Sequence, residues 1–255
     1  MPIELTDTYF DRKSVGDFET LVAQYRKSEF EPPFRSTIPL LCLIRDKPIL
    51  NDLMTRCGFS SDCEFRFEFQ VSPPLGDGKP SRIDLMLIDD GQCVAIDAKW
   101  TEPLSELVKD WLGPQPTTNR RDVLSGWLSL VNRQATIPVT AEAVGEVSYQ
   151  LLHCAASACN TSNRPQVCTL QFRSKQDDDA AMSQVRRDDL ARLRDALGRP
   201  DRFAFRYIEI DIEPTPAFHK LAKLPKRSKK SAIAVQQALV SETLFAFNAL
   251  RELLV

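Results

Sequence analysis

The sequence predicts an α/β protein in which a mixed central sheet is flanked by helices. Residues 63–71 alternate strictly between apolar and polar side chains, which is typical of a strand with one polar face. Two apolar runs follow within 81–99, and the residues Asp89-Asp90-Gly91-Gln92 between them predict a hairpin turn. Helical spacing of apolar residues before and after these strands supplies the flanking layers.

The predicted elements follow one another without an internal repeat. The first two helices have recognisable ends: Ser14 or Asp17 caps one, while Pro48 begins and Gly58 ends the other. In chain order we expect helices at 14–27 and 47–58, strands at 63–71, 81–89 and 92–99, helices at 102–113, 119–133 and 141–159, a strand at 166–172, a helix at 177–197, a strand at 203–212 and a helix at 231–254.

A chain of 255 residues can bury one large core or two modest ones. Because no clear linker divides the predicted elements, we expect a single domain over 1–255. Its core covers about residues 45–172, and residues 173–255 form a C-terminal elaboration that adds a strand and helices.

The composition is that of an ordinary globular protein, with 43% hydrophobic and 27% charged residues. The net charge of −2 excludes a global basic field, so nucleic-acid binding would have to rely on local patches. The seven cysteines include no Cys-x-x-Cys pair and mostly lie in apolar contexts. They indicate reduced core residues of a cytoplasmic protein rather than a zinc site or a disulfide framework.

No targeting or membrane segment is expected. The N-terminus lacks a basic start followed by an apolar block, so it does not have the pattern of a secretory signal. No apolar run approaches the roughly 20 residues that span a bilayer. We therefore expect a soluble cytoplasmic protein with no membrane partner.

Charged side chains interrupt the predicted hairpin. Asp84 lies within the first apolar run, Asp97 lies within the second, and Lys99 follows Asp97 at a spacing of two. Because strand side chains alternate between faces, Asp97 and Lys99 should project to the same side of the sheet. The plain alternative is a structural ion pair on an exposed sheet face.

Two carboxylates beside a lysine on adjacent strands suit hydrolysis of a phosphodiester by metal-bound water. Asp84 and Asp97 would hold Mg²⁺ or Mn²⁺, which prefer carboxylate oxygen, and the backbone carbonyl of Ala98 would add a ligand. The metal would lower the pKa of its bound water and offset the charge on the phosphate. Lys99 would orient that water or help to stabilise the transition state.

The pattern Arg82-Ile83-Asp84, then twelve residues, then Asp97-Ala98-Lys99 resembles the motif of the PD-(D/E)xK phosphodiesterase superfamily, which has the restriction-endonuclease-like fold. The preceding helix and alternating strand match that family's αβββαβ core, and the resemblance covers about residues 45–172. The stretches 97–103 and 149–153 also resemble a group of bacterial restriction-endonuclease-like proteins of unassigned role. The resemblance implies a metal-dependent nuclease with both aspartates as metal ligands and the lysine as catalytic residue.

Some positions of the family pattern need separate assignment. Ile83 replaces the family's usual proline, which does not touch a ligand. The additional acid of the family is assigned to Glu68, on the polar face of its strand, with Glu64 second and Asp52 third. The family often has a glutamine on the helix after the motif, and Gln150 could fill that place.

Other candidates have a simpler structural interpretation. His153 and Tyr149 lie on the same predicted helix, and His153 is expected to be a satisfied core histidine because a metal mechanism needs no histidine base. Glu102 is expected to cap a helix that begins at Pro103. The acids at 177–179 suit the N-terminus of the following helix, where the helix dipole favours negative charge.

The run 219–230 carries six lysine or arginine residues within eleven positions and is broken by Pro225. On a nearly neutral protein these side chains form a local positive patch, and we expect them to contact nucleic-acid phosphates without sequence preference. A solvated loop is the alternative. The six residues are Lys220, Lys223, Lys226, Arg227, Lys229 and Lys230.

The expected function is that of a Mg²⁺-dependent endonuclease that cleaves DNA, with a role in restriction or antiphage defence by fold-level analogy. The alternatives are a ribonuclease and a non-cleaving nucleic-acid-binding or assembly module, although retention of both aspartates and the lysine argues against the latter. A homodimer or an activating partner protein is expected, because double-strand cleavage by a single-site fold normally needs two copies. Nothing in the hairpin selects a substrate.

Overall fold

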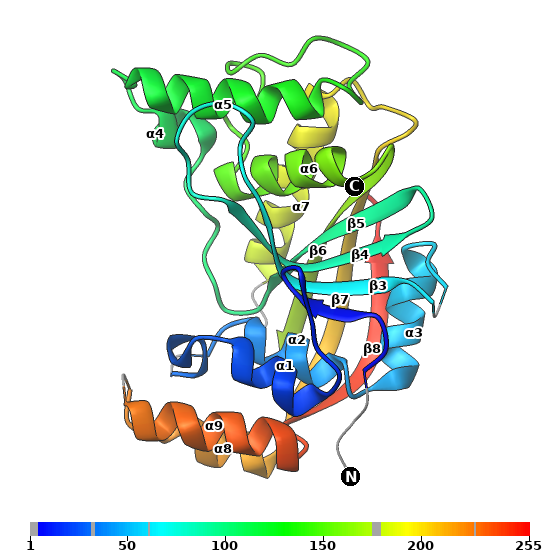
Figure 1. The fold of residues 1–255 in the computed structure, drawn as a ribbon, viewed down its shortest axis with the longest axis vertical. Coiled ribbons are helices and arrows are strands. Elements are labelled where there is room, and N and C mark those ends of the chain that lie inside the picture. Colours follow the sequence, from blue (N-terminus) through cyan, green and yellow to red (C-terminus); the bar gives the residue numbers. More distant parts are fainter. Residues whose placement is uncertain (1–4, 32–33, 61, 175–179, 227) are drawn as a thin grey trace.

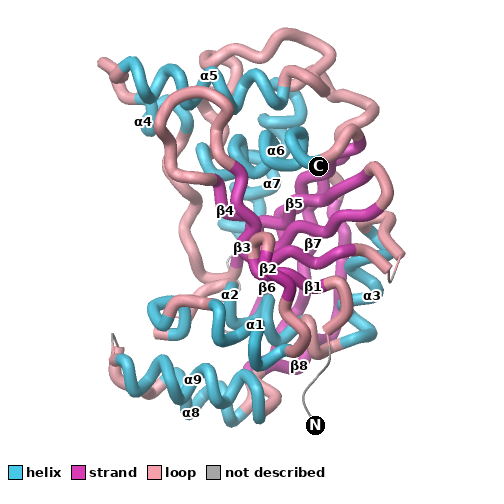
Figure 2. Tube along the Cα trace, in the orientation of Figure 1, coloured by secondary structure: helices cyan, strands magenta, loops and turns pink. Residues whose placement is uncertain are grey.

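The computed structural model describes residues 5–31, 34–60, 62–174, 180–226 and 228–255. Within them the chain forms one mixed sheet of eight strands in the order β2-β1-β3-β4-β5-β6-β7-β8, with helices on both sides (Figure 1; Figure 2). The predicted α/β class with a mixed central sheet is confirmed. The strands are β1 (Thr8–Phe10), β2 (Lys13–Ser14), β3 (Glu64–Val71), β4 (Ser81–Asp89), β5 (Gln92–Lys99), β6 (Arg164–Ser174), β7 (Ala204–Pro214) and β8 (Phe245–Leu253).

The pairing directions divide the sheet into two halves. β3, β4 and β5 form an antiparallel meander, whereas β5, β6 and β7 run parallel to one another. β8 closes one edge antiparallel to β7, and β1 lies parallel to β3 beside the small strand β2 at the other edge. Parallel neighbours need crossover connections, and helices supply these between β5 and β6 and between β6 and β7.

The helices form a layer on each face of the sheet (Figure 1). Residues of α1, α2, α3, α8 and α9 pack into a first hydrophobic core, and those of α4, α5, α6 and α7 pack into a second core on the other face. None of the helices in the described part of the chain is long and apolar enough to cross a membrane. The helices are α1 (Phe18–Gln24), the 3₁₀ helix η1 (Lys27–Phe30), α2 (Thr37–Leu43), α3 (Lys47–Arg56), α4 (Val108–Leu112), α5 (Thr118–Val131), α6 (Tyr149–Thr161), α7 (Ala180–Ala196), α8 (Pro216–Ala222) and α9 (Lys229–Ser241).

Strand β5 divides its side chains between the two cores. Ile96 packs into the first core, whereas Ala95 packs into the second. By the same alternation, Asp97 and Lys99 face the side that carries the second core. Helix α6 contributes to that core and lies over this part of the sheet. The two charged residues of β5 therefore meet α6.

The strict alternation predicted for β3 breaks at Glu68. Phe67 packs in the first core, but Phe69, two positions later, packs in the second. Glu68 has a φ of +50°, in the left-handed region that non-glycine residues seldom adopt. Asp11 bridges this position, because its N–H donates to the Phe67 carbonyl (2.7 Å) and its carboxylate accepts the Gln70 N–H (2.9 Å). The single apolar face predicted for this strand is therefore wrong.

The C-terminal segment contains a strand, although its apolar spacing predicts one helix over 231–254. Helix α9 ends at Ser241, and the next residue, Glu242, is already extended. β8 then pairs with β7 along the edge of the sheet. Short apolar runs fit a helix and a strand about equally well, and the open edge of β7 offers backbone hydrogen bonds that favour the strand.

Helix α6 begins later than the helix predicted over 141–159. It starts at Tyr149, where the side chain of the preceding residue, Ser148, accepts the Leu151 N–H and so caps the helix. The hydrogen bond of Ser148 thus determines where α6 begins, which the spacing of apolar residues did not determine. The expected acidic cap at 177–179 falls outside the described residues.

Phe245→Ala tests the packing of the C-terminal strand. Phe245 is 2% exposed, and its ring centroid lies 5.4 Å from that of Trp100 and 4.7 Å from that of Phe218. The truncation should lower the free energy of unfolding by about 3–5 kcal/mol, because it removes a buried aromatic ring and leaves a cavity. Urea denaturation measures the change beside Asn248→Ala, an exposed position of β8 expected to change by less than about 0.5 kcal/mol. Equal effects of the two variants would contradict this packing.

Candidate active site

Asp84 lies where β4 and β5 separate. The paired register of these strands starts at the hairpin turn and ends at Leu85 opposite Ile96. Beyond that point, Oδ2 of Asp84 accepts the backbone N–H of Ala98 at 2.8 Å. A side chain thus bonds to β5 where backbone pairing has stopped, and this bond fixes the carboxylate beside the end of β5.

Asp97, Lys99 and Gln150 form a closed hydrogen-bonded triangle. Nζ of Lys99 donates to Oδ1 of Asp97 (2.8 Å) and to Oε1 of Gln150 (2.9 Å). Nε2 of Gln150 donates to the same Asp97 oxygen (2.9 Å). Asp97 and Lys99 are each 7% exposed, so the ion pair is largely removed from solvent. Because Gln150 lies in the first turn of α6, this helix orients both charged side chains of β5.

Asp84 lies near more negative than positive side chains. Burial, followed by the nearby charge of Asp97, raises the pKa of Asp84 well above its usual range, and Lys99 offsets this only in part. Burial favours the neutral amine of Lys99, but the charges of Asp97 and Asp84 hold its pKa above the ordinary value. The site therefore keeps a protonated lysine beside an excess of carboxylate.

Glu68 reaches the same region from β3. Its carboxylate lies 3.5 Å from the guanidinium of Arg82, and burial raises the pKa of Glu68 despite that neighbour. A left-handed backbone costs a non-glycine residue about 1–2 kcal/mol, and such strain is concentrated at functional sites. The strained backbone at Glu68 thus coincides with the position at which its side chain approaches the cleft.

A cleft of about 580 Å³ opens in front of these residues. Asp97 does not line the cleft, but its Oδ1 accepts hydrogen bonds from Lys99 and Gln150, which do. The other two acids considered for the site lie elsewhere: Glu64 pairs with Arg66 (2.6 Å), and Asp52 pairs with Arg56 (3.1 Å). The predicted site residues that line the cleft are Glu68, Asp84, Ala98, Lys99 and Gln150.

The donor atoms around the cleft suit a hard divalent ion. Asp84 supplies a carboxylate oxygen at the cleft, Asp97 supplies one next to Lys99, and Ala98 and Glu68 line the same cleft. Among the described residues, no three His, Cys, Asp or Glu side chains stand close enough to hold a metal ion by themselves. Mg²⁺ fits such a set, because it is commonly held by one or two carboxylates and keeps several waters. A ligand role for Glu68 stays a prediction.

Glu102 fixes the chain after β5 to the start of α2 and does not cap a helix that begins at Pro103. One carboxylate oxygen accepts the N–H and the hydroxyl of Ser36 (2.6 and 2.7 Å), and the other accepts the Trp100 N–H (2.7 Å). Burial opposes ionisation, but these hydrogen bonds lower the pKa of Glu102. The helix predicted to start at Pro103 and to span 102–113 is reduced to α4, because the chain after Glu102 is held in a loop.

Helix α7 supports the site through hydrogen bonds to β6, to the loop after β5 and to the start of α6, a role that could not be predicted from the sequence. The guanidinium of Arg186 donates to Oε1 of Gln171 and to the backbone carbonyl of Glu102. Asp189 accepts the N–H (2.9 Å) and the hydroxyl (2.6 Å) of Ser148, the N-cap residue of α6. These partners are distant in sequence, so the amphipathic pattern of α7 could not identify them.

His153 and Tyr149 are structural neighbours of the site. Nδ1 of His153 lies 2.7 Å from Oγ of Ser81, and burial lowers the pKa of this histidine to about 4. Its ring is therefore neutral at neutral pH, as suits the structural role predicted for it. The Tyr149 ring stacks on Trp111 with centroids 4.1 Å apart, and its hydroxyl accepts the Trp127 indole N–H at 3.1 Å.

The basic segment, residues 220–230, spans the end of α8 and the start of α9 rather than a single loop. Phe218 precedes it and is buried, with its ring centroid 5.5 Å from that of Trp100, the residue directly after Lys99. The segment is thus anchored near the end of β5. Arg227 lies outside the described residues, and the described lysines are all exposed: Lys220, Lys223, Lys226, Lys229 and Lys230.

Glu102→Gln should destabilise the protein in a pH-dependent manner. Near neutral pH the carboxylate accepts three hydrogen bonds that an amide cannot all accept, so the free energy of unfolding should fall by about 1–3 kcal/mol. Because the folded-state pKa is lowered, the stability contributed by the carboxylate is present above the unfolded pKa of about 4.3 and is lost as pH falls through the folded value. The difference from wild type should therefore shrink on acidification.

Urea denaturation near neutral pH and again at about pH 3, below the unfolded pKa, measures this difference. Glu213→Gln, which alters an exposed carboxyl of β7, is the control and should change the free energy of unfolding by less than about 0.5 kcal/mol. A deficit of Glu102→Gln that grows as the pH is lowered would contradict the interpretation.

Comparison with known proteins gives a family but no individual relative. No curated protein and no solved structure matches the chain. The family described as a domain of unknown function, DUF6946, matches residues 12–202. This range includes every residue that lines the cleft and ends before β7, so the basic segment and β8 lie beyond it. Since the match covers more than half of its length, the chain belongs to the DUF6946 family, a domain of unknown function.

Proposed function

We propose that this protein is a metal-dependent nuclease that hydrolyses DNA phosphodiester bonds, with a PD-(D/E)xK site on a restriction-endonuclease-like fold. The observation that carries the proposal is the convergence of Asp84, Asp97 and Lys99 with Gln150 at one end of β4 and β5, beside a cleft. A structural ion pair on an exposed sheet face, the plain alternative, accounts neither for the burial of Asp97 and Lys99 nor for the cleft.

The order of elements around the site supports the fold assignment. Helix α3, the meander β3-β4-β5, helix α6 and the parallel strand β6 follow the αβββαβ order of that superfamily's core. Helices α4 and α5 are inserted before α6, while β7 and β8 extend the sheet. Because a fold does not imply a function, the assignment rests on the residues of the site.

Each residue of the site has a defined task in this proposal. Asp84 and Asp97 would hold Mg²⁺ or Mn²⁺, with Glu68 and the Ala98 carbonyl as further oxygen donors. The bound ion would supply an activated water and offset the negative charge of the phosphate. Lys99, kept protonated by its carboxylate neighbours, donates hydrogen bonds to the attacking water or to a phosphate oxygen.

Regions outside the cleft would bind the rest of the substrate. The exposed lysines of the basic segment are suited to phosphate contacts, which give affinity but no sequence preference. Cleavage of both strands of a duplex would need a second copy of the chain or an activating partner. A role in restriction or antiphage defence follows only from analogy with the fold.

A cleavage panel tests the proposal with plasmid DNA, single-stranded DNA and RNA in Mg²⁺, Mn²⁺ or EDTA. We expect cleavage of DNA that EDTA abolishes. Asp97→Asn and Lys99→Gln should each slow it by at least about 100-fold, because the first removes a proposed metal ligand and the second removes the cation that acts on the attacking water or the phosphate. Lys109→Gln, which removes an exposed lysine outside the cleft, is the matched control and should keep wild-type activity.

The outcomes of the panel separate the candidate functions. Metal-dependent cleavage that persists in both site variants would overturn the site assignment. Cleavage of RNA without cleavage of DNA would make the protein a ribonuclease. No cleavage of any substrate by folded wild-type protein would favour a non-cleaving nucleic-acid-binding or assembly module, and thermal unfolding shows whether each variant remains folded.

Gln150→Ala should reduce the cleavage rate by about 10–100-fold, because Gln150 orients Asp97 and Lys99 without taking part in the chemistry. Displacement of the Asp97 carboxylate should also raise the Mg²⁺ concentration that gives the half-maximal rate. Gln237→Ala, at an exposed position of α9, is the control. An unchanged rate and an unchanged Mg²⁺ requirement in Gln150→Ala would show that the triangle has no positioning role.

A further inference from the structure

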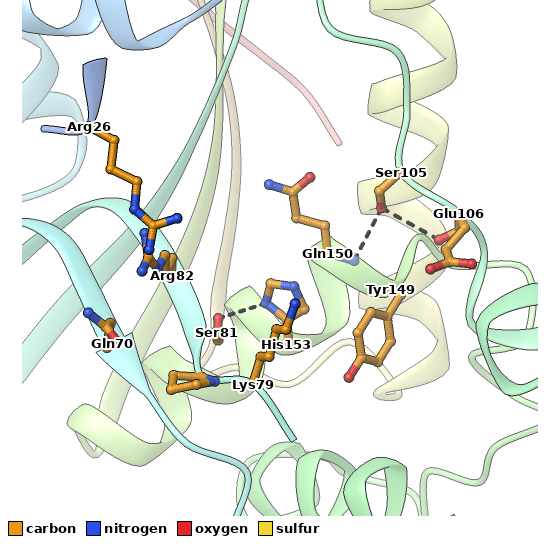
Figure 3. Close-up of a pocket in the computed structure, with 11 residues that line it drawn as sticks. Arg26, Gln70, Lys79, Ser81, Arg82, Ser105, Glu106, Tyr149, Gln150 and His153 are labelled. Carbon is orange, nitrogen blue, oxygen red and sulfur yellow. Dashed lines mark hydrogen bonds between the residues drawn. The ribbon is translucent and has the colours of Figure 1, made fainter. Parts of the chain in front are cut away.

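A second chamber, of about 720 Å³, adjoins the cleft and shares Arg82, Ser105 and Gln150 with it (Figure 3). It is lined by the residue before η1, the ends of β3 and β4, the loop before β4, the loop after β5 and α6. None of the roles proposed above for the site residues involves this chamber. Its position beside Gln150 places it next to the proposed point of cleavage.

One wall of the chamber is cationic. Arg26 and Arg82 line this wall, and in Figure 3 both guanidinium groups lie on the side opposite Gln150. Lys79 lines the chamber elsewhere, and all three side chains are exposed. Both arginines lie near Glu68, which is 3.5 Å from Arg82 and offsets part of their charge. Glu68 itself lines the neighbouring cleft, whereas Glu106, the carboxylate among the residues that line the chamber, lies across it beside Tyr149 (Figure 3). Converging guanidinium groups form a site for an anion, and phosphate matches their fork-shaped donors.

Apart from Glu106, the remaining wall offers hydrogen bonds from uncharged side chains. Ser81 and the neutral His153 are hydrogen-bonded to each other at 2.7 Å, and Gln70 and Gln150 contribute amide groups. A cationic wall facing mainly neutral polar groups suits a ligand that has a phosphate at one end and a sugar and base at the other. A nucleotide has this distribution of charge.

The size of the chamber restricts the form of the substrate. Pockets of about 300–1,000 Å³ accept ligands of the size of a cofactor. One nucleotide fits such a space, whereas the two paired strands of a duplex cannot enter it together. A base can therefore enter the chamber only if its nucleotide is unpaired.

We infer that this chamber binds one unpaired nucleotide next to the scissile phosphate, with that nucleotide's phosphate between Arg26 and Arg82, and that the substrate is a single strand. The inference rests on the proposed nuclease function for the identity of the ligand. It adds the strandedness of the substrate, which the cleavage chemistry alone leaves open.

Fluorescence anisotropy in EDTA tests the inference, because removal of the metal separates binding from cleavage. The probes are a labelled single strand of about 12 nucleotides and the duplex of the same sequence. We expect at least about tenfold tighter binding of the single strand. Arg26→Gln and Arg82→Gln should each weaken it by about 5–10-fold and lower the slope of log K against log salt by about 0.7, the value for one phosphate contact.

Arg202→Gln is the matched control, because Arg202 is exposed in the turn before β7, at the end of the parallel strands away from Lys99. Its affinity for the single strand should stay within about twofold of wild type. Equal or tighter binding of the duplex, unchanged affinity in Arg26→Gln and Arg82→Gln, or no binding of either probe would each overturn the inference. Loss of duplex affinity in the same variants would replace it with extrusion of a nucleotide from a duplex.

Binding and cleavage are scored separately, so the two proposals can fail independently. Protein that binds the single strand through these arginines but cuts no substrate with Mg²⁺ would refute the nuclease and keep the chamber as a nucleotide site. Metal-dependent cleavage with unchanged binding in both arginine variants would refute the chamber and keep the nuclease.

Discussion

The hydrogen bond from the Ala98 N–H to the Asp84 carboxylate is the interaction on which the site depends. It lies just past the last paired residues of β4 and β5, so the two strands are tied together there by a side chain instead of by their backbones. On β4 this is also where the side chains change sides: Leu85 packs in the first core and Ile83 in the second. The change at Glu68 in β3 occurs at the same level. A sheet that paired and alternated regularly through this region would have no opening for the cleft.

The charged residues at this opening are held by elements that contribute no reacting group. Removing an ion pair such as Asp97 and Lys99 from water costs several kcal/mol per ion before their mutual attraction is counted, so their geometry must be well satisfied. Gln150 completes that geometry from α6, and Asp189 of α7 bonds to Ser148 at the start of α6. The position of the lysine thus depends on two helices that lie beyond the hairpin in sequence.

The central strands and the motif residues could be predicted because their signals are local. The alternation that predicted a strand at β3, the Asp-Asp-Gly turn and the strand period that puts Asp97 and Lys99 on one face all involve neighbours in sequence, whereas the exchange of faces at Glu68 does not follow from them. The edge strand β8 could not be predicted in this way, since its apolar spacing also fits a helix and the open edge of β7 decides the outcome. The roles of Arg186 and Arg26 could not be predicted for a related reason. Arg186 bonds to residues that are distant in sequence, and Arg26 lines a chamber that is formed by distant segments.

The C-terminal part of the chain is integral to the site even though the family match ends at residue 202. Trp100, the residue after Lys99, packs against Phe218 and Phe245, both of which lie beyond the match. Phe34, which lines the cleft, also contacts Phe218, with ring centroids 5.3 Å apart. These aromatic contacts join the end of β5 to α8 and β8, so the backbone that carries Lys99 is supported on one side by α6 and on the other by the C-terminal segment. Any chain that kept only the matched residues would lose the partners of Trp100 and expose the edge of β6, and its cleft would no longer have the packing that defines it.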